Sequence, residues 1–211
     1  RKTAKGQNVP DDWCYVYNFS NPDNPVALRL PAGMAVSFRK DMEELVKELQ
    51  VELPKELESQ LYEEHKNQII KEFQNKKNEL LEEFENSAKA ANFQIKKTPT
   101  GIVMVPAIEG KPLEEEDIEK LTESAKDEIK KKQEMLYEHF NQISREIRKL
   151  EKDAQKKLAN LETETAKATI SPRIEELKEK YKNFPEISKY LGDVEKDMIE
   201  KIGNRYDKSG P

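Results

Sequence analysis

The chain has 211 residues with 37 basic and 42 acidic side chains, so its formal net charge is −5. With 37% charged residues, 35% hydrophobic residues and only 7 glycines, the composition is typical of long helices or coiled coils. The charges are mixed in sign, which disfavours nucleic-acid binding, and no apolar run approaches the roughly 18 residues of a membrane span. The single cysteine, Cys14, excludes a disulfide within the chain and is typical of a reducing compartment, so we expect a cytoplasmic protein.

The first predicted element is a strand at Trp13 to Phe19. This run reads Trp-Cys-Tyr-Val-Tyr-Asn-Phe, and its nearly continuous aromatic and β-branched character is typical of a strand that is buried on both faces. A short extended piece at Val26 to Leu30 follows in a proline-rich loop, but the other convincing strands lie far along the chain. We therefore expect a lone strand from an incomplete α/β domain, and hence a piece of a larger protein.

Three shorter amphipathic helices flank the long helical region. The first is expected at about Ala35 to Leu53, where an apolar face made by Phe38, Met42, Leu45 and Leu49 ends near Pro54. Two more are expected near the C-terminus, on either side of Phe184-Pro185. Their apolar residues are Ile174, Leu177 and Tyr181 in one, and Ile187, Tyr190, Leu191, Val194, Met198 and Ile202 in the other.

Two long helices between these flanks each carry a single apolar stripe. The first is expected at about Lys55 to Ala91 and the second at about Thr122 to Thr169, with a break at Pro172. Steps of three and four residues predict two seams that face each other in an antiparallel coiled-coil arm. The seam residues are Leu57, Leu61, Ile69, Phe73, Leu80, Phe84, Ala88 and Ala91, and then Leu136, Phe140, Ile143, Ile147, Leu150, Ala154, Leu158, Leu161, Thr165 and Ala168.

A β-hairpin is predicted at about residues 93–106, between the two arm helices. Thr98-Pro99-Thr100-Gly101 supplies the turn. Either the helix ends and a short acidic helix at Leu113 to Leu121 cover its apolar faces, or an exposed apolar patch binds unfolded chain or a neighbouring subunit. On the second interpretation, the residues expected to contact substrate are Phe93, Ile95, Ile102 and Met104.

No catalytic, cofactor or metal site is predicted from the residues. His65 and His139 lie within the long helices without a cysteine or a close set of carboxylates, and Cys14 has no activating neighbour in its strand. The acidic run from Glu114 to Asp117 is typical of a helix N-terminus rather than of a metal site. A glycine-rich phosphate loop of the form G-x-x-x-x-G-K-[ST] is missing from the 211 residues.

Several segments, spread over nearly the whole chain, match one known pattern. The most specific are the Trp-Cys-Tyr-Val-x-Asn-Phe strand at residues 13–19 and the Leu-Pro-Ala-Gly that follows at residues 30–33. Further matches are Phe38-Arg39-Lys40-Asp41-Met42, Thr98-Pro99-Thr100-Gly101-Ile102-Val103-Met104-Val105-Pro106, and Phe184-Pro185-Glu186-Ile187 with Tyr190-Leu191. Together these segments resemble a Lon-type AAA+ protease branch that carries a large helical insertion in its ATPase module.

This resemblance implies a fold and a parent activity. The Walker A loop would precede the Trp13 strand, and the Walker B strand and the Ser-Lys proteolytic dyad would follow the insertion, so the chain would be a fragment without catalytic residues. The parent would be a serine endopeptidase, either ATP-dependent with ATP and Mg²⁺ or ATP-independent, assembled as a hexameric ring. The implied divisions are 1–33 for part of the AAA+ domain, 34–54 for a base helix, 55–169 for the arm, and 170–211 for base helices and a polar tail.

Three functions remain open from the sequence. The arm could recruit or gate unfolded polypeptide for a proteolytic chamber, which is the function we expect. It could instead be a structural arm that sets subunit packing in the ring. The chain could also be an unrelated coiled-coil holdase or scaffold.

Overall fold

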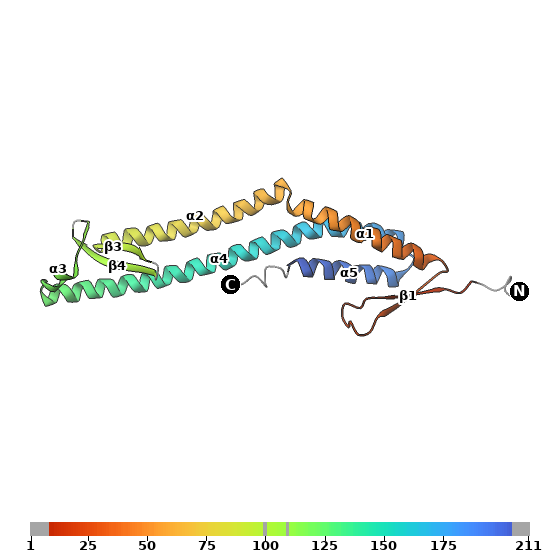
Figure 1. Cartoon of the computed structure of the whole chain (residues 1–211), viewed down its shortest axis with the longest axis horizontal. Helices are drawn as coiled ribbons and strands as arrows, with labels where there is room; N and C mark the ends of the chain where they lie inside the picture. The colour runs from red at the N-terminus through yellow and green to blue at the C-terminus, as the bar shows by residue number, and fades with distance from the viewer. Residues whose placement is uncertain (1–8, 99–100, 109, 204–211) are drawn as a thin grey trace, which may run out of the picture. The chain divides into compact units, whose positions relative to one another are not determined.

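A computed structural model describes residues 9–98, 101–108 and 110–203 (Figure 1). The fold is mainly helical with small antiparallel sheets, which confirms the expected fold class. The chain divides into two compact units, one made of the residues up to Lys66 and from Lys157 onward, and the other of Asn67–Lys156. In the described ranges, no helix combines the length and the apolar character that a membrane crossing needs.

The first unit begins with a two-stranded antiparallel sheet. Strand β1 (Asp12–Val16) pairs with β2 (Val26–Leu30), with Cys14 opposite Leu28. The predicted lone strand is therefore wrong, and so is its burial on both faces, because the side chains of Trp13 and Tyr15 are 60% and 75% exposed. Aromatic rings with polar groups tolerate a solvated face, so an unbroken aromatic run did not imply double burial.

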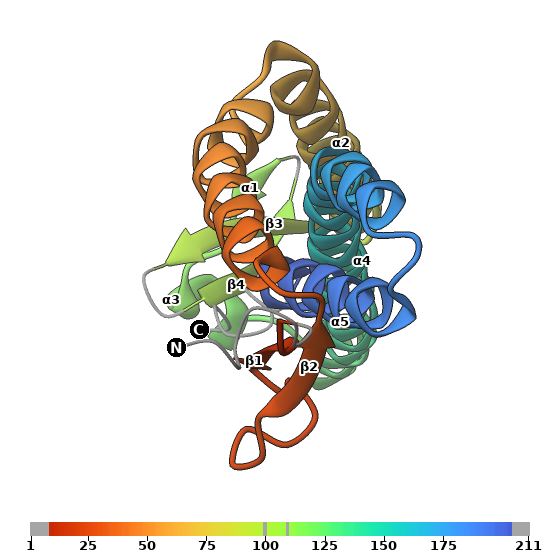
Figure 2. The same cartoon turned by 90° about the vertical axis from the view of Figure 1, so that its right-hand side faces the viewer.

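Helices α1 (Met34–Leu57) and α5 (Pro185–Gly203) pack with the C-terminal part of α4 (Glu123–Lys180) to form the core of the first unit (Figure 2). The sheet contributes Leu28 and Leu30, which are almost fully buried. Side chains alternate between the two faces of a strand, so both leucines face the core and their neighbours along β2 are exposed. The other buried residues of this core are Phe38, Leu45, Leu49, Ala166, Ile170, Ile174, Tyr181, Ile187, Leu191, Val194 and Ile202.

Two prolines lie inside helices, where the sequence predicted helix ends. Helix α1 continues for one turn past Pro54, and α4 runs through Pro172 to Lys180. Proline costs a helix about 3 kcal/mol. Ile170 and Ile174, on either side of Pro172, are 1% and 0% exposed, and burying two such side chains offsets that cost at about 1.5–3 kcal/mol each. The predicted break at Pro172 is therefore wrong.

Helix α2 (Gln60–Ala90) starts after a break at Glu58 and Ser59. The hydroxyl of Ser59 accepts a hydrogen bond of 3.2 Å from the Tyr62 N–H, as an N-cap residue does. The break changes which residues face the core, since Tyr62 is 7% exposed and the predicted seam residue Leu61 is 63% exposed. The seam is also wrong at Ala168, which is exposed while Ala166 is buried.

The second unit holds the predicted hairpin, formed by β3 (Phe93–Thr98) and β4 (Gly101–Ile108). A short strand β5 (Lys111–Pro112) extends the sheet in the order β3-β4-β5, and the short helix α3 (Glu115–Glu119) follows. The hairpin shares a core with residues of both predicted seams. The buried members of this core are Phe84, Ala88, Phe93, Met104, Leu136 and Ile143, with Leu80, Ala91, Ile95, Ile129, Phe140 and Ile147 partly buried around them.

Candidate functional site

The four predicted contact residues lie on one face of the hairpin. In the β3–β4 register, Ile95 is opposite Met104, Phe93 is opposite Pro106, and Lys97 is opposite Ile102. Since side chains alternate between faces along a strand, Phe93, Ile95, Ile102 and Met104 share the same face. The register therefore brings the four residues together.

Burial divides these four residues into two pairs. Phe93 and Met104 are each 2% exposed and belong to the core with Phe84, whose ring centroid is 5.4 Å from that of Phe140. Ile95 and Ile102, nearer the turn, are only half-buried. Phe93 and Met104 therefore anchor the hairpin to the helices, while Ile95 and Ile102 are the two that a ligand can reach.

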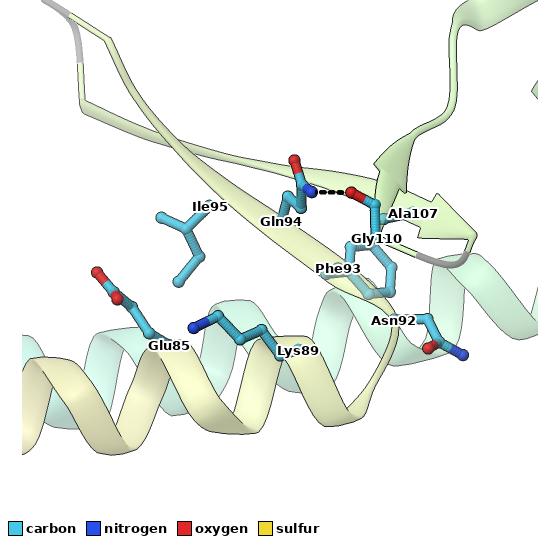
Figure 3. Close-up of a pocket in the computed structure, with 8 residues that line it drawn as sticks. All are labelled: Glu85, Lys89, Asn92, Phe93, Gln94, Ile95, Ala107 and Gly110. Carbon is cyan, nitrogen blue, oxygen red and sulfur yellow. Dashed lines mark hydrogen bonds between the residues drawn. The ribbon is translucent and has the colours of Figure 1, made fainter.

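A pocket of about 390 Å³ lies beside Ile95, between the end of α2 and the hairpin (Figure 3). Glu85 and Lys89 of α2 form its charged rim, and both are exposed. In Figure 3, Ile95 extends from β3 toward the side on which Glu85 and Lys89 lie. We call this the hairpin pocket; its lining residues are Glu85, Lys89, Asn92, Phe93, Gln94, Ile95, Ala107 and Gly110.

Two polar residues shape the hairpin pocket. Asn92 follows the end of α2 in the left-handed conformation, with φ of 66°, which asparagine adopts more readily than most residues. The side-chain amide of Gln94 donates a hydrogen bond to the carbonyl of Gly110, which ties β3 to the turn before β5 (Figure 3). The left-handed conformation of Asn92 turns the chain from helix to strand, and the hydrogen bond of Gln94 closes one side of the pocket.

The hairpin pocket combines apolar and polar lining residues. An apolar wall with a few charged and amide groups at its rim suits an apolar side chain whose neighbours are polar. No sequence pattern pointed to Glu85, Lys89 or Gln94. Asn92 could have been found, because asparagine just after a predicted helix is a frequent left-handed terminator.

A second surface lies in the first unit, on the outer face of β1. Trp13, Tyr15 and the following Tyr17 are 60%, 75% and 54% exposed, so three aromatic side chains stand in a row. A groove of about 490 Å³ lies beside Tyr15 and Tyr17. Its lining also includes Cys14, Val16, residues of α1 and Tyr190 of α5. Cys14 points to the other face of β1, where burial is the main cause that raises the pKa of its thiol, so it is not an activated nucleophile.

Ser171, Lys178 and Glu195 form a polar cluster that resembles a nucleophile with a base. The Ser171 hydroxyl donates to Glu195 at 2.5 Å, and the Lys178 ammonium is 3.1 Å from the same carboxylate and 2.7 Å from Glu175. The hydrogen bond to Glu175 is the main cause that raises the pKa of Lys178, so this side chain stays protonated and cannot accept a proton from the hydroxyl. The cluster joins α4 to α5.

The histidines show no sign of a metal site. His139 packs edge-on against Phe84, with ring centroids 5.7 Å apart, and His65 is exposed at the other end of α2. Within the described ranges, no group of three or more His, Cys, Asp or Glu side chains could hold an ion.

Comparison with known families identifies one region of similarity. Residues 12–45 match the model of the Lon-like LonC helical domain, and no curated protein matches the chain. The matched residues take in β1, β2 and the first half of α1, including the exposed aromatic side chains. The match supports the resemblance to a helical region of Lon-like proteases in this part of the chain.

Proposed function

We propose that this chain is a helical, non-catalytic component of a Lon-like protease, and that it binds unfolded polypeptide at the hairpin pocket. The match of residues 12–45 to the LonC helical domain supports the relation to Lon-like proteases. The proposed binding rests on the half-buried Ile95 and the open pocket beside it. Unfolded chains display the apolar side chains that such a pocket accommodates, whereas folded proteins bury theirs.

The proposed role is to hold a substrate segment before it reaches a proteolytic chamber elsewhere in the assembly. Burying one apolar side chain contributes about 1.5–3 kcal/mol, which is too little for tight binding by one pocket. A weak and reversible contact suits recruitment, because the segment must be released again. Several copies in a ring, such as the proposed hexamer, would raise the overall affinity by multivalency.

Subunit packing is the second candidate function, favoured by the exposed row of Trp13, Tyr15 and Tyr17. Tyrosine and tryptophan are enriched in protein interfaces. The two functions use different units of the chain, so variants can separate them.

The test is a fluorescence anisotropy titration of the 211-residue chain against one labelled protein in two forms. Reduced, carboxymethylated α-lactalbumin is the unfolded form, and native α-lactalbumin is the folded form. We expect the unfolded form to bind about tenfold or more tightly, and Ile95→Asp to weaken this binding by about tenfold or more. Val46→Asp, at a 39% exposed position of α1, is the matched control and should change nothing.

Equal affinity for the two forms, or equal binding by the Ile95→Asp and Val46→Asp variants, would overturn the proposal. Sedimentation of the wild-type chain and of Tyr15→Ser tests the alternative. Self-association that is lost in Tyr15→Ser, together with no preference for the unfolded protein, would favour subunit packing.

A further inference from the structure

The outer edge of β3 carries backbone groups that point away from the sheet. The carbonyl of Asn92 accepts a hydrogen bond of 2.7 Å from the Ala107 N–H. This bond fixes which residues of β3 form hydrogen-bonded pairs with β4. On the other side of β4, the carbonyl of Pro106 accepts a bond of 2.8 Å from the Leu113 N–H and so points away from β3. Every second residue of β3 counted from Asn92 is therefore hydrogen-bonded to β4, and the residues between them are not.

This alternation determines the direction in which the backbone N–H and C=O groups of each β3 residue point. Gln94 and Lys96 turn their N–H and C=O groups toward β4, whereas Phe93 and Ile95 turn theirs outward. In the described part of the chain, β3 is the edge strand of its sheet, in the order β3-β4-β5. Outward N–H and C=O groups at a sheet edge are satisfied best by another extended backbone.

Ile95 joins this edge to the hairpin pocket. Its outward backbone groups lie on the edge, and its side chain lines the pocket with Glu85 and Lys89. A segment that adds to the edge would place alternate side chains on the face that Ile95 occupies. The backbone of a guest strand and one of its apolar side chains would thus be bound at the same place.

The charges around Ile95 indicate which segment fits. Lys89 and Lys96 are both exposed near Ile95, and Glu85 is the one acidic residue among the described residues that line the pocket. A lysine on an edge strand, here Lys96 of β3, disfavours pairing with a second copy of the same strand. Both lysines attract carboxylates, so an apolar segment with acidic flanks suits this edge.

We propose that an extended, acidic-flanked segment of unfolded polypeptide binds as an additional strand along the outer edge of β3, with an apolar side chain in the hairpin pocket. This inference rests on the proposed function, because it specifies how the same site would hold an unfolded chain. It adds a requirement that capture by side chains alone lacks, namely backbone hydrogen bonds to Ile95.

The test compares Ile95→Pro with Ile95→Ala in the 211-residue chain. Proline removes the outward N–H while it keeps more apolar surface than alanine, and edge strands tolerate it. The probe is a short labelled peptide that alternates leucine with threonine between glutamate flanks. We expect Ile95→Pro to bind the peptide about tenfold more weakly than Ile95→Ala does, as the loss of a backbone bond requires.

A structural control accompanies these variants. Protection of the Val103 N–H from hydrogen exchange reports the β3–β4 pairing, because Val103 is opposite Lys96. If Ile95→Pro loses that protection, strand addition is tested instead by binding of the wild-type chain to a peptide that is N-methylated at every central residue. Strand addition predicts that this peptide binds about tenfold more weakly or worse than the unmodified one.

The outcomes separate the proposals. Equal losses in Ile95→Pro and Ile95→Ala, or full binding of the N-methylated peptide, would overturn strand addition and leave pocket capture intact. A preference for a lysine-flanked peptide would also overturn it, since Lys89 and Lys96 lie near Ile95. Concentration-dependent dimerisation that the peptide does not displace would assign the edge to a second copy. If neither the peptide nor unfolded α-lactalbumin binds the wild-type chain, the proposed function itself fails.

Discussion

The carbonyl oxygen of Asn92 accepts a hydrogen bond from the backbone N–H of Ala107 at 2.7 Å. This bond lies directly after α2, where Asn92 adopts a φ of 66°, and it starts the pairing that runs along the hairpin. A one-residue shift would move every side chain of β3 to the other face and bring Gln94 into the core in place of Phe93. The conformation of Asn92 therefore helps to determine on which face of the hairpin each residue of the candidate site lies.

The first prediction concerns the backbone at Asn92. Asn92→Ala should destabilise the second unit by about 1 kcal/mol, because alanine adopts the left-handed conformation less readily. Asn92→Gly should have a smaller effect, since glycine has no such penalty. Urea unfolding followed by circular dichroism measures both. Equal stabilities for the two variants would contradict the assigned backbone conformation.

The second prediction concerns the hairpin anchors. Replacing Phe93 and Met104 by Ser should abolish hairpin protection in hydrogen exchange, because each deletion from a core costs about 2–5 kcal/mol. Val103→Ser, at a 43% exposed position of the same hairpin, should cost less than about 1 kcal/mol. An intact hairpin in the double variant would show that Phe93 and Met104 are not core residues. Because the double variant is expected to unfold the hairpin, a loss of ligand binding in it would not locate the binding surface.

The third prediction concerns acid stability of the first unit. Burial by itself would raise the pKa of Asp41, but hydrogen bonds from Lys180 at 2.6 Å and Tyr181 at 2.5 Å outweigh it, so the pKa lies below its usual value. A carboxyl whose pKa is lowered on folding stabilises the protein above its unfolded pKa, and this contribution is lost as the pH falls through the folded pKa.

We therefore expect the stability that Asp41 provides to be complete at neutral pH and to decline below about pH 4. Asp41→Asn should be less stable than the wild type at pH 7, and the difference should shrink as the medium becomes more acidic. Thermal melts across this pH range measure it. A difference that stays constant down to the most acidic sample would contradict the assigned contacts.

The fourth prediction uses Trp13, the one tryptophan of the chain. Its side chain is 60% exposed, so acrylamide should quench its fluorescence almost as well in the folded chain as in urea. Strong shielding in the folded chain would mean that the outer face of β1 is covered. A dilution series would then show whether the cover is a second copy, because that shielding would disappear at low concentration.

The hairpin shows how much a local pattern predicts. A turn sequence between two apolar runs was enough to place β3 and β4, and alternation placed Phe93 and Ile95 on one face. The pattern could not show that Phe93 and Met104 are buried while Ile95 is only half-buried, because that depends on packing against residues such as Phe84 and Leu136. The pocket rim has the same origin, since Glu85 and Lys89 look like ordinary surface charges in the sequence.

The first unit shows where local rules lose to tertiary packing. Pro172 ends helices in most contexts, yet buried Ile170 and Ile174 hold α4 together around it. The aromatic run at Trp13 is typical of a strand buried on both faces, yet Trp13 and Tyr15 are exposed. The run is not unpaired either, because its partner β2 begins only ten residues after β1 ends. Neither the cost that a core can offset nor the exposure of an aromatic face follows from the local sequence alone.

Site-specific photocrosslinking tests directly whether unfolded polypeptide binds at the hairpin pocket. A benzophenone amino acid replaces Lys89 at the rim of the hairpin pocket in one sample and the exposed Val46 of α1 in another. Each sample is irradiated with unfolded and with native α-lactalbumin. We expect crosslinks between position 89 and the unfolded protein, which an excess of the acidic-flanked peptide prevents. Few crosslinks are expected from position 46 or to the native protein. Equal crosslinking from the two positions, or none from position 89, would contradict binding at this pocket.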